Sequence, residues 1–164
     1  MRRMSPWRLP VAALCLIVGL SSCASSPKGG VDTYSAGTLA RTEALSLGST
    51  SIVSEDPAAK GLEPSLQGLV EGGLRAAGLS VAAPGEASAW RVDLLIRSRS
   101  YLFDLSSYTS LSCRMSIVEI ASGKEIGSAE LVEDTKYPIE SLSYLRDLVG
   151  RTARALASAA FSKK

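Results

Sequence analysis

The stretch W-R-V-D-L-L-I-R-S-R-S-Y-L at residues 90–102 alternates apolar and polar side chains with a period of two. This period is typical of a β-strand with one face on a core and the other toward water. The expected apolar positions are Trp90, Val92, Leu94, Ile96 and Leu102, and the polar ones are Arg91, Asp93, Arg97, Arg99 and Tyr101. We therefore expect a long strand on a buried layer.

Two further runs continue this pattern downstream. Residues 111–117 alternate in the same way, and A-S-G-K at 121–124 predicts a hairpin turn before a third strand at 126–132. A serine-rich loop is expected over 104–110, between the first two strands. Upstream, S-I-V at 51–53 is a shorter candidate strand before the turn-like E-D-P at 55–57, and T-L-A at 38–40 is a weaker one.

Two amphipathic helices complete the domain. Residues 62–77 have apolar side chains every three or four positions, with Pro64 in the first turn and Gly78 at a C-terminal cap. A second helix is expected to open at Pro138 and to place an apolar stripe from Leu142 to Ala160 on the core. The sequence thus predicts an α+β two-layer sandwich, with a mostly antiparallel sheet of about four strands and two helices on one face.

The N-terminus has the features of an export signal. Three arginines precede the apolar run at 11–20, and small residues then lead to Cys23. The run is about half the length needed to cross a bilayer as a helix. We expect a signal peptide at 1–22, a flexible tether rich in serine and glycine at 23–37, and one folded domain at 38–164.

Leu20-Ser21-Ser22-Cys23 resembles the lipobox of bacterial lipoproteins. The resemblance implies that Cys23 becomes the first residue of the mature chain and carries acyl chains, palmitate among them. Two or more chains hold a protein on a membrane stably. Ala24, by resemblance to enterobacterial sorting, favours the outer membrane with the domain facing the periplasm. The alternative is an ordinary cleaved signal with an incidental cysteine.

Charge and composition exclude several functions. The full chain has 18 basic and 16 acidic residues, but without the three signal arginines the counts are 15 and 16, so no nucleic-acid partner is indicated. Histidine is absent, which removes the commonest general base and most zinc sites. We expect no enzyme activity, no metal and no cofactor; a serine and carboxylate hydrolase is the least implausible enzyme.

Three arginines are the candidate ligand site. Arg91, Arg97 and Arg99 share one face of the predicted strand, and Arg114 on the next strand is a possible fourth. Guanidinium groups match phosphate oxygens, so an anionic lipid or glycolipid is a possible ligand. The alternative is a solvated sheet face paired with nearby carboxylates.

Other polar residues have simpler interpretations. Cys113 lies in an apolar register and is expected to be a buried small hydrophobe, with a reactive thiol as the alternative. Glu130, Glu133 and Asp134 lack the spacing of a calcium loop and are expected to form a charged strand edge. The loop with Asp104, Ser106, Ser107 and Tyr108 is a possible partner contact.

The order of elements resembles the small lipoproteins of LPS assembly (LptE-like) over residues 49–161. The shared features are the strand before E-D-P at 55–57, the helix closing in L-R-A-A-G-L at 74–79, the hairpin with Gly123-Lys124 and the long last helix. The resemblance implies a lipid-anchored module that binds an envelope partner without catalysis. The alternative is a direct lipid or glycolipid binder that uses the arginine face.

Overall fold

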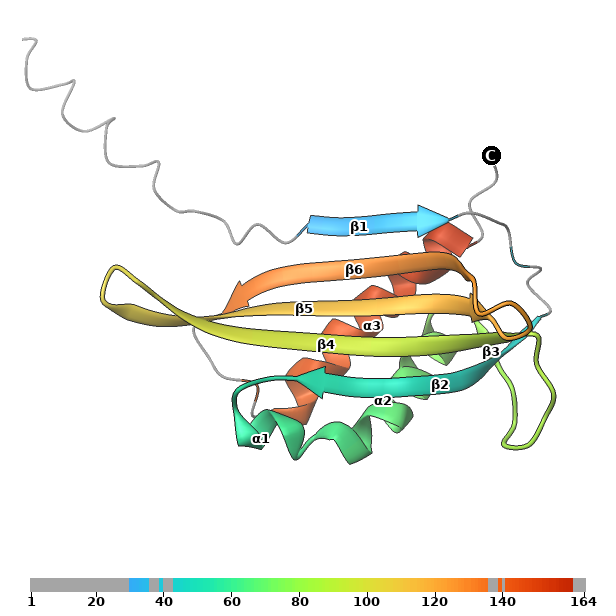
Figure 1. The fold of residues 1–164 in the computed structure, drawn as a ribbon, viewed down its shortest axis with the longest axis horizontal. Coiled ribbons are helices and arrows are strands. Elements are labelled where there is room, and N and C mark those ends of the chain that lie inside the picture. The colour runs from blue at the N-terminus through green and yellow to red at the C-terminus, as the bar shows by residue number, and fades with distance from the viewer. Residues whose placement is uncertain (1–29, 36–38, 40–42, 136–138, 140, 161–164) are drawn as a thin grey trace, which may run out of the picture.

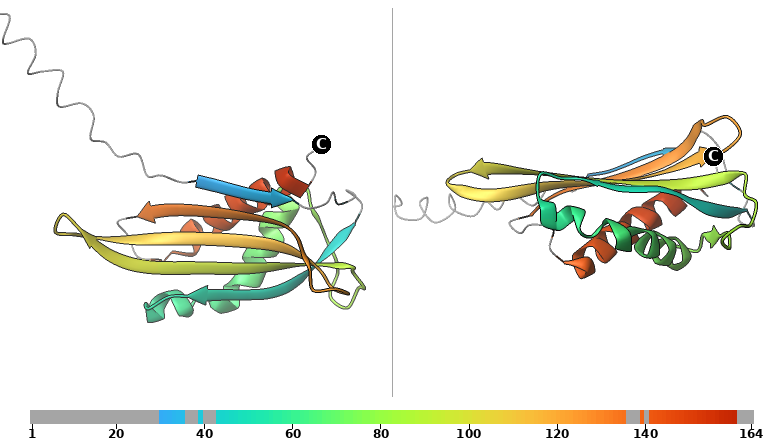
Figure 2. Two further views of the ribbon diagram at one scale, coloured as in Figure 1. Left: turned by 45° about the horizontal axis from the view of Figure 1, so that its top comes forward. Right: turned by 60° about the horizontal axis from the view of Figure 1, so that its bottom comes forward.

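The protein is a two-layer α+β domain, described by a computed structural model for residues 30–35, 39, 43–135, 139 and 141–160. Two long helices lie against one face of the sheet (Figure 1; Figure 2, right). The elements are β1 (Gly30–Ser35), β2 (Ala44–Val53), α1 (Pro57–Lys60), α2 (Glu63–Ala76), β3 (Ser80–Val81), β4 (Trp90–Phe103), β5 (Ser106–Glu119), β6 (Glu125–Thr135) and α3 (Leu142–Ala160). The predicted fold class is confirmed, with differences in the number of strands and helices.

The described strands form one mixed sheet of six in the order β1-β6-β5-β4-β2-β3. The pairs β1–β6, β6–β5 and β5–β4 are antiparallel, whereas β2 pairs in parallel with both β3 and β4. The parallel pairs follow from the chain path, because α1 and α2 cross over the sheet between β2 and its neighbours. The expectation of about four strands is therefore too low by β1 and by β3, which has only two residues.

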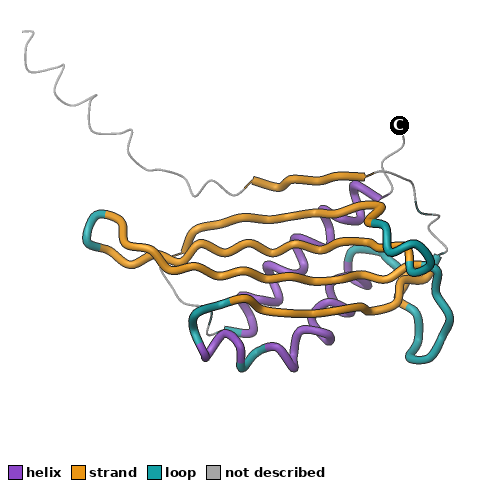
Figure 3. The backbone as a smooth tube through the Cα atoms, viewed as in Figure 1, coloured by secondary structure: helices purple, strands orange, loops and turns teal. Residues whose placement is uncertain are grey.

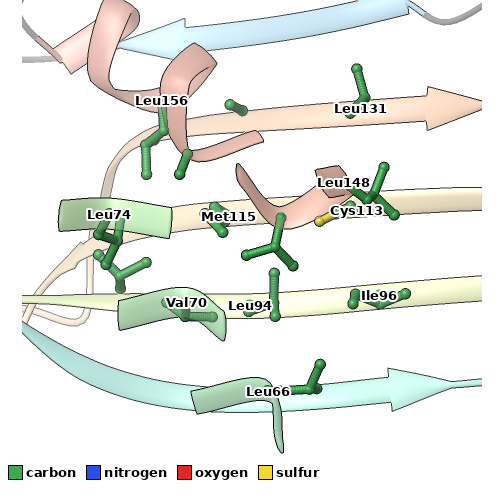
Figure 4. Packing of buried hydrophobic residues seen from close by; sticks show 14 of the residues in the cluster. Leu66, Val70, Leu74, Leu94, Ile96, Cys113, Met115, Leu131, Leu148 and Leu156 are labelled. Atoms are coloured by element: carbon green, nitrogen blue, oxygen red, sulfur yellow. The ribbon is translucent and has the colours of Figure 1, made fainter. Parts of the chain in front are cut away.

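The core lies between the sheet and α2 and α3, as the period of two requires. Val92, Leu94 and Ile96 of β4 are buried under the helices, and Leu66, Val70 and Leu74 of α2 pack over them (Figure 4). Neighbouring β5 adds Leu111, Cys113, Met115 and Ile117, and α3 adds Leu145, Leu148, Val149 and Leu156. We call this side of the sheet the inner face and the other side the outer face.

The predicted ends of the helices agree with the structure for α2, whereas α3 begins later than predicted. Pro64 lies in the first turn of α2, and Gly78 follows its end with a φ of +81°, a left-handed conformation that glycine adopts without strain. The last helix begins at Leu142, four residues after the predicted start at Pro138, which lies outside the described residues.

The predicted tether is shortened by a strand. Gly30–Ser35 forms β1 and pairs with β6 from Gly30 opposite Val132 to Ser35 opposite Gly127. A run rich in small and polar residues has no clear strand pattern of its own, so the pairing depends on the exposed edge of a partner about 100 residues away in the chain. The predicted signal peptide at 1–22, Cys23 and residues 24–29 lie outside the described residues.

The β4–β5 hairpin projects beyond the helices (Figures 1 and 3). The loop predicted over 104–110 is instead a turn of two residues, because β4 reaches Phe103 and β5 starts at Ser106. Leu102 is in the predicted apolar register but is 80% exposed, since the packed layer of helices ends before it. Leu105 is fully exposed.

The turn itself places side chains in an unfavourable backbone region. Asp104 and Leu105 have φ values of +48° and +59°. Two consecutive residues with positive φ match the tight hairpin turns in which Asn-Gly or Asp-Gly is preferred. Asp104 tolerates this region, but a leucine there is strained by contact between its Cβ and the backbone.

Replacing Leu105 with glycine is expected to raise the free energy of unfolding by about 1 kcal/mol, because glycine adopts positive φ without this strain. Urea unfolding monitored by circular dichroism would measure the change. Leu105→Ala serves as the control, since alanine removes the leucine side chain but keeps the Cβ; a similar gain in that variant would contradict the explanation by strain.

Candidate functional site

The three candidate arginines lie on the outer face of β4 but do not form one patch. Arg97 and Arg99 are both exposed and lie two residues apart, about 7 Å along the strand. Arg91 lies toward the other end of β4 and forms an ion pair with Asp93, with Nε 3.2 Å from Oδ2. The structure therefore groups Arg97 with Arg99 and separates Arg91 from them.

Arg114 is occupied by carboxylates of the neighbouring strand. Its Nη2 lies 2.8 Å from Oε1 of Glu125, and its Nη1 lies 3.8 Å from Oε2 of Glu130. Burial raises the pKa of Glu125, but hydrogen bonds from Ser128 and Ser116 together with the charge of Arg114 lower it overall. This residue therefore belongs to an ion-paired cluster and is not free for an anionic ligand.

A shallow hollow of about 450 Å³ lies beside Arg97 and Arg99. Its lining comes from three neighbouring strands and the turn after β2: Val53, Ser54, Glu55, Arg97, Ser98, Arg99, Ser110 and Ser112. Within the described part of the chain, neither arginine has an ion-pair partner. Two free guanidinium groups beside serine hydroxyls provide donors for an anion, with Glu55 as the opposing charge.

The acidic residues of β6 lie only partly on the predicted strand edge. β5 flanks the whole group, but β1 covers the other side of β6 only from Gly127 to Val132. Glu130 therefore lies inside the sheet, whereas Glu133 and Asp134 lie beyond the last residue paired with β1. Glu130 accepts a hydrogen bond from Ser112, and Glu133 accepts from Arg151 and from Tyr144 of α3. The described residues contain no group of three or more potential metal ligands.

Glu133 connects the sheet to α3. Its Oε2 lies 2.9 Å from Nη2 of Arg151, and that arginine also pairs with Asp147 one turn earlier. Burial raises the pKa of the Tyr144 hydroxyl, and its hydrogen bond to Glu133 raises it further. These contacts fix the start of α3 on β6 and are structural.

Cys113 is a buried core residue, as its register predicts. Its side chain has no exposed surface, and burial raises the pKa of the thiol to about 11. Because the thiolate is the nucleophile, a thiol with this pKa is almost wholly protonated and unreactive at neutral pH.

A second hollow, which the sequence analysis missed, lies between α2 and α3 on the side away from the sheet. It has a volume of about 760 Å³ and is lined by Ser65, Gly68, Leu69, Gly72, Gly73, Ala76, Leu142, Ser143, Arg146, Asp147, Gly150 and Arg154. The glycines make the groove, because a Cβ added at Gly68 or Gly72 would have no atom within 4 Å. The signal in the sequence is the set of three glycines within this helix, Gly68, Gly72 and Gly73, which leave its outer side without side chains.

The described part of the chain is thus a small α+β domain with a projecting hairpin and a groove between its helices. Two of its arginines, Arg97 and Arg99, have no ion-pair partner among the described residues. Among the described residues, no helix is long and apolar enough to cross a membrane. No family model and no curated protein matches the sequence.

Solved structures share the fold. The PelC dodecamer from Paraburkholderia phytofirmans has a TM-score of 0.54 and 18% identity, and covers 79% of this chain and 97% of that chain. A second crystal form, of a PelC dodecamer with one substituted residue, gives 0.53 and 19% with the same coverage. Lipoprotein GNA1162 from Neisseria meningitidis is more distant, with a TM-score of 0.40, 16% identity and coverage of 71% and 99%. At these identities the two PelC structures show a common fold.

Proposed function

We propose that this protein is a lipid-anchored envelope protein that acts as a non-enzymatic assembly module. The fold shared with PelC, which was solved as a dodecamer, is the observation that carries the assembly role. The lipobox residues Leu20 to Cys23 carry the anchor. By Ala24, the residue after the cysteine, we propose the outer membrane as the site of attachment and the periplasm as the compartment of the domain.

The anchor is tested by the mass of the protein extracted from its own membrane. Acylation at Cys23 adds the mass of the lipid to a chain that begins at this residue, and Cys23→Ser should abolish both the added mass and the cleavage. A mature protein with an unmodified thiol at position 23 would contradict the anchor.

The assembly role is tested by the size of the purified protein and by crosslinking in intact envelopes. The groove between α2 and α3 is the surface that we assign to contact with another copy, since its glycine floor accepts protruding side chains. A Cβ at Gly72 meets no atom within 4 Å, so Gly72→Leu should place its side chain in the groove and reduce the assembled fraction while the fold is kept.

Light scattering of detergent-extracted protein compares Gly72→Leu with the wild type, and Ser158→Leu, an exposed position of α3, is the matched control. A monomeric wild type with no crosslinked envelope component would contradict the assembly role. The resemblance to LPS-assembly lipoproteins names the first class of partner to seek among the crosslinked products.

A second candidate function is favoured by the unpaired state of Arg97 and Arg99. We propose that these residues bind an anionic lipid or glycolipid at the hollow beside them. The double variant Arg97→Glu/Arg99→Glu reverses the local charge and should remove the anionic lipid that co-purifies with the protein, as measured by mass spectrometry.

The matched control for this prediction is Lys60→Glu/Arg75→Glu, which changes the net charge equally at exposed positions of the helical layer. Equal lipid content in both double variants and the wild type would remove the lipid-binding function and leave the assembly role untouched.

A further inference from the structure

We propose that the tip of the β4–β5 hairpin inserts into the surface of the same bilayer that holds the acylated Cys23. The inference rests on the lipid anchor proposed above and adds a second membrane contact, made by the folded domain itself. The occupant is a bilayer with anionic headgroups. The described hairpin provides an apolar end, a pair of tyrosines behind it and the two free arginines farther back.

The strand register places the anchor and the hairpin at the same end of the sheet. Gly30 pairs with Val132, Val132 with Ser112, and Ser112 with Arg97. These four residues form one row across β1, β6, β5 and β4. β1 therefore begins at the end of the sheet from which the hairpin projects (Figures 1 and 2).

From this row, the reach of the chain back to Cys23 is similar to the length of the hairpin out to Leu105. Gly30 lies seven positions after Cys23, and the chain from one to the other spans at most about 25 Å. Leu105 lies eight positions after Arg97 along the hairpin, a rise of roughly 26 Å. An acylated Cys23 in the headgroup region thus allows the hairpin to reach the same surface.

The end of the hairpin is unfavourable for a domain surrounded by water. Leu102 is 80% exposed and Leu105 is fully exposed, and Leu105 also has a strained backbone with a φ of +59°. Neither side chain contacts the hydrophobic core of the described domain. A bulky apolar side chain at a strained, protruding position gains free energy only from a contact outside the molecule.

The residues behind the tip suit the headgroup region. Tyr101 and Tyr108 stack across the two strands with their ring centroids 5.8 Å apart, and tyrosines favour the interface between lipid and water. Arg99 and Arg97 follow on the same face and are attracted to anionic headgroups. Asp104 at the turn and Asp134 on β6 oppose this attraction, so the apolar tip must supply the insertion and the arginines the preference for anionic lipid.

The test measures contact of the tip with lipid in the acylated, membrane-extracted protein reconstituted into vesicles. L105W places a fluorophore at the turn, and vesicles of phosphatidylglycerol with dibrominated phosphatidylcholine quench an indole that enters the acyl boundary. Ile120→Trp is the matched control, because Ile120 is an apolar residue, 47% exposed, at the opposite end of the sheet. L102W is a second probe in the tip if L105W does not fold.

We expect the added fluorescence of L105W to fall at least about twofold in brominated vesicles, as for a side chain buried at the acyl boundary, with I120W unaffected. Arg97→Glu/Arg99→Glu should weaken the quenching of L105W in anionic vesicles and leave it unchanged in vesicles of phosphatidylcholine alone. Absence of quenching in both L105W and L102W, or crosslinking of the tip to a second copy or another protein, would overturn the inference.

The mass of Cys23 in the same sample separates this result from the proposed function. Acylated protein with an unquenched tip contradicts the membrane contact alone. Protein without acyl chains contradicts the anchor, and quenching of its tip would then show membrane contact that does not depend on lipidation.

Discussion

Replacing Gly73 with leucine is expected to lower the free energy of unfolding by about 2 kcal/mol, through overpacking between α2 and α3. A Cβ at Gly73 already lies 3.4 Å from Cγ1 of Val149 and 3.6 Å from both Cβ of Ala153 and Cα of Gly150. The Cβ itself fits at van der Waals distance, but the three further carbons of leucine must either press on Val149 and Ala153 of α3 or adopt the rotamer that leads into the groove.

The neighbouring Gly72 provides the control. Leucine there points into the groove, meets no atom within 4 Å of its Cβ and gains helix propensity, so the free energy of unfolding should rise by up to about 1 kcal/mol. Urea unfolding of both variants in detergent at a concentration that keeps the protein monomeric measures the difference. Equal effects at the two glycines would contradict the observed contact between the helices.

The second large effect is a loss of stability at alkaline pH caused by Cys113. An unfolded thiol loses its proton near pH 9, whereas burial raises the pKa in the folded state to about 11. The folded state therefore binds more protons between these values, and the free energy of unfolding should fall as the pH rises from 9 to 11, by about 3 kcal/mol in total.

Urea midpoints at pH 8.0 and pH 10.5 measure this loss, and Cys113→Ala is the control because it removes the titrating group. The variant should be less stable at pH 8 but should lose less stability on going to pH 10.5. Tyr144, whose pKa is also raised, contributes the same change in the free energy of unfolding with pH to both proteins. Identical slopes would contradict a buried protonated thiol, as would rapid alkylation of Cys113 in the folded protein.

The predictable parts of the fold are those set by local pattern. The period of two in β4 and β5 and the apolar stripe of α2 determine the buried faces, because each pattern can satisfy only one arrangement against a core. The pairings of β1 and β3 were not predictable from local sequence. Both are short edge strands whose structure depends on pairing with a partner strand. The predicted burial of Leu102 was wrong for a related reason: the strand register shows which face a residue is on, but not where the covering helices end.

The candidate site was predictable in composition but not in grouping. Arg91, Arg97 and Arg99 share a face because they are two residues or a multiple of two apart. Which of them remains unpaired depends on Asp93 within the strand and on the reach of each side chain across it. Arg114 could not be assigned either, because its partners Glu125 and Glu130 come from a strand whose register the sequence left open.

The position of β1 also affects the order in which the chain can fold during the export that we propose. A chain exported from its N-terminus brings β1 out among the first segments of the domain. Its partner β6 follows about 100 residues later, and contacts across so long a separation form slowly. Under the proposed lipid anchor, acylation of Cys23 can therefore precede completion of the sheet, and the edge of β6 stays open until β1 pairs with it.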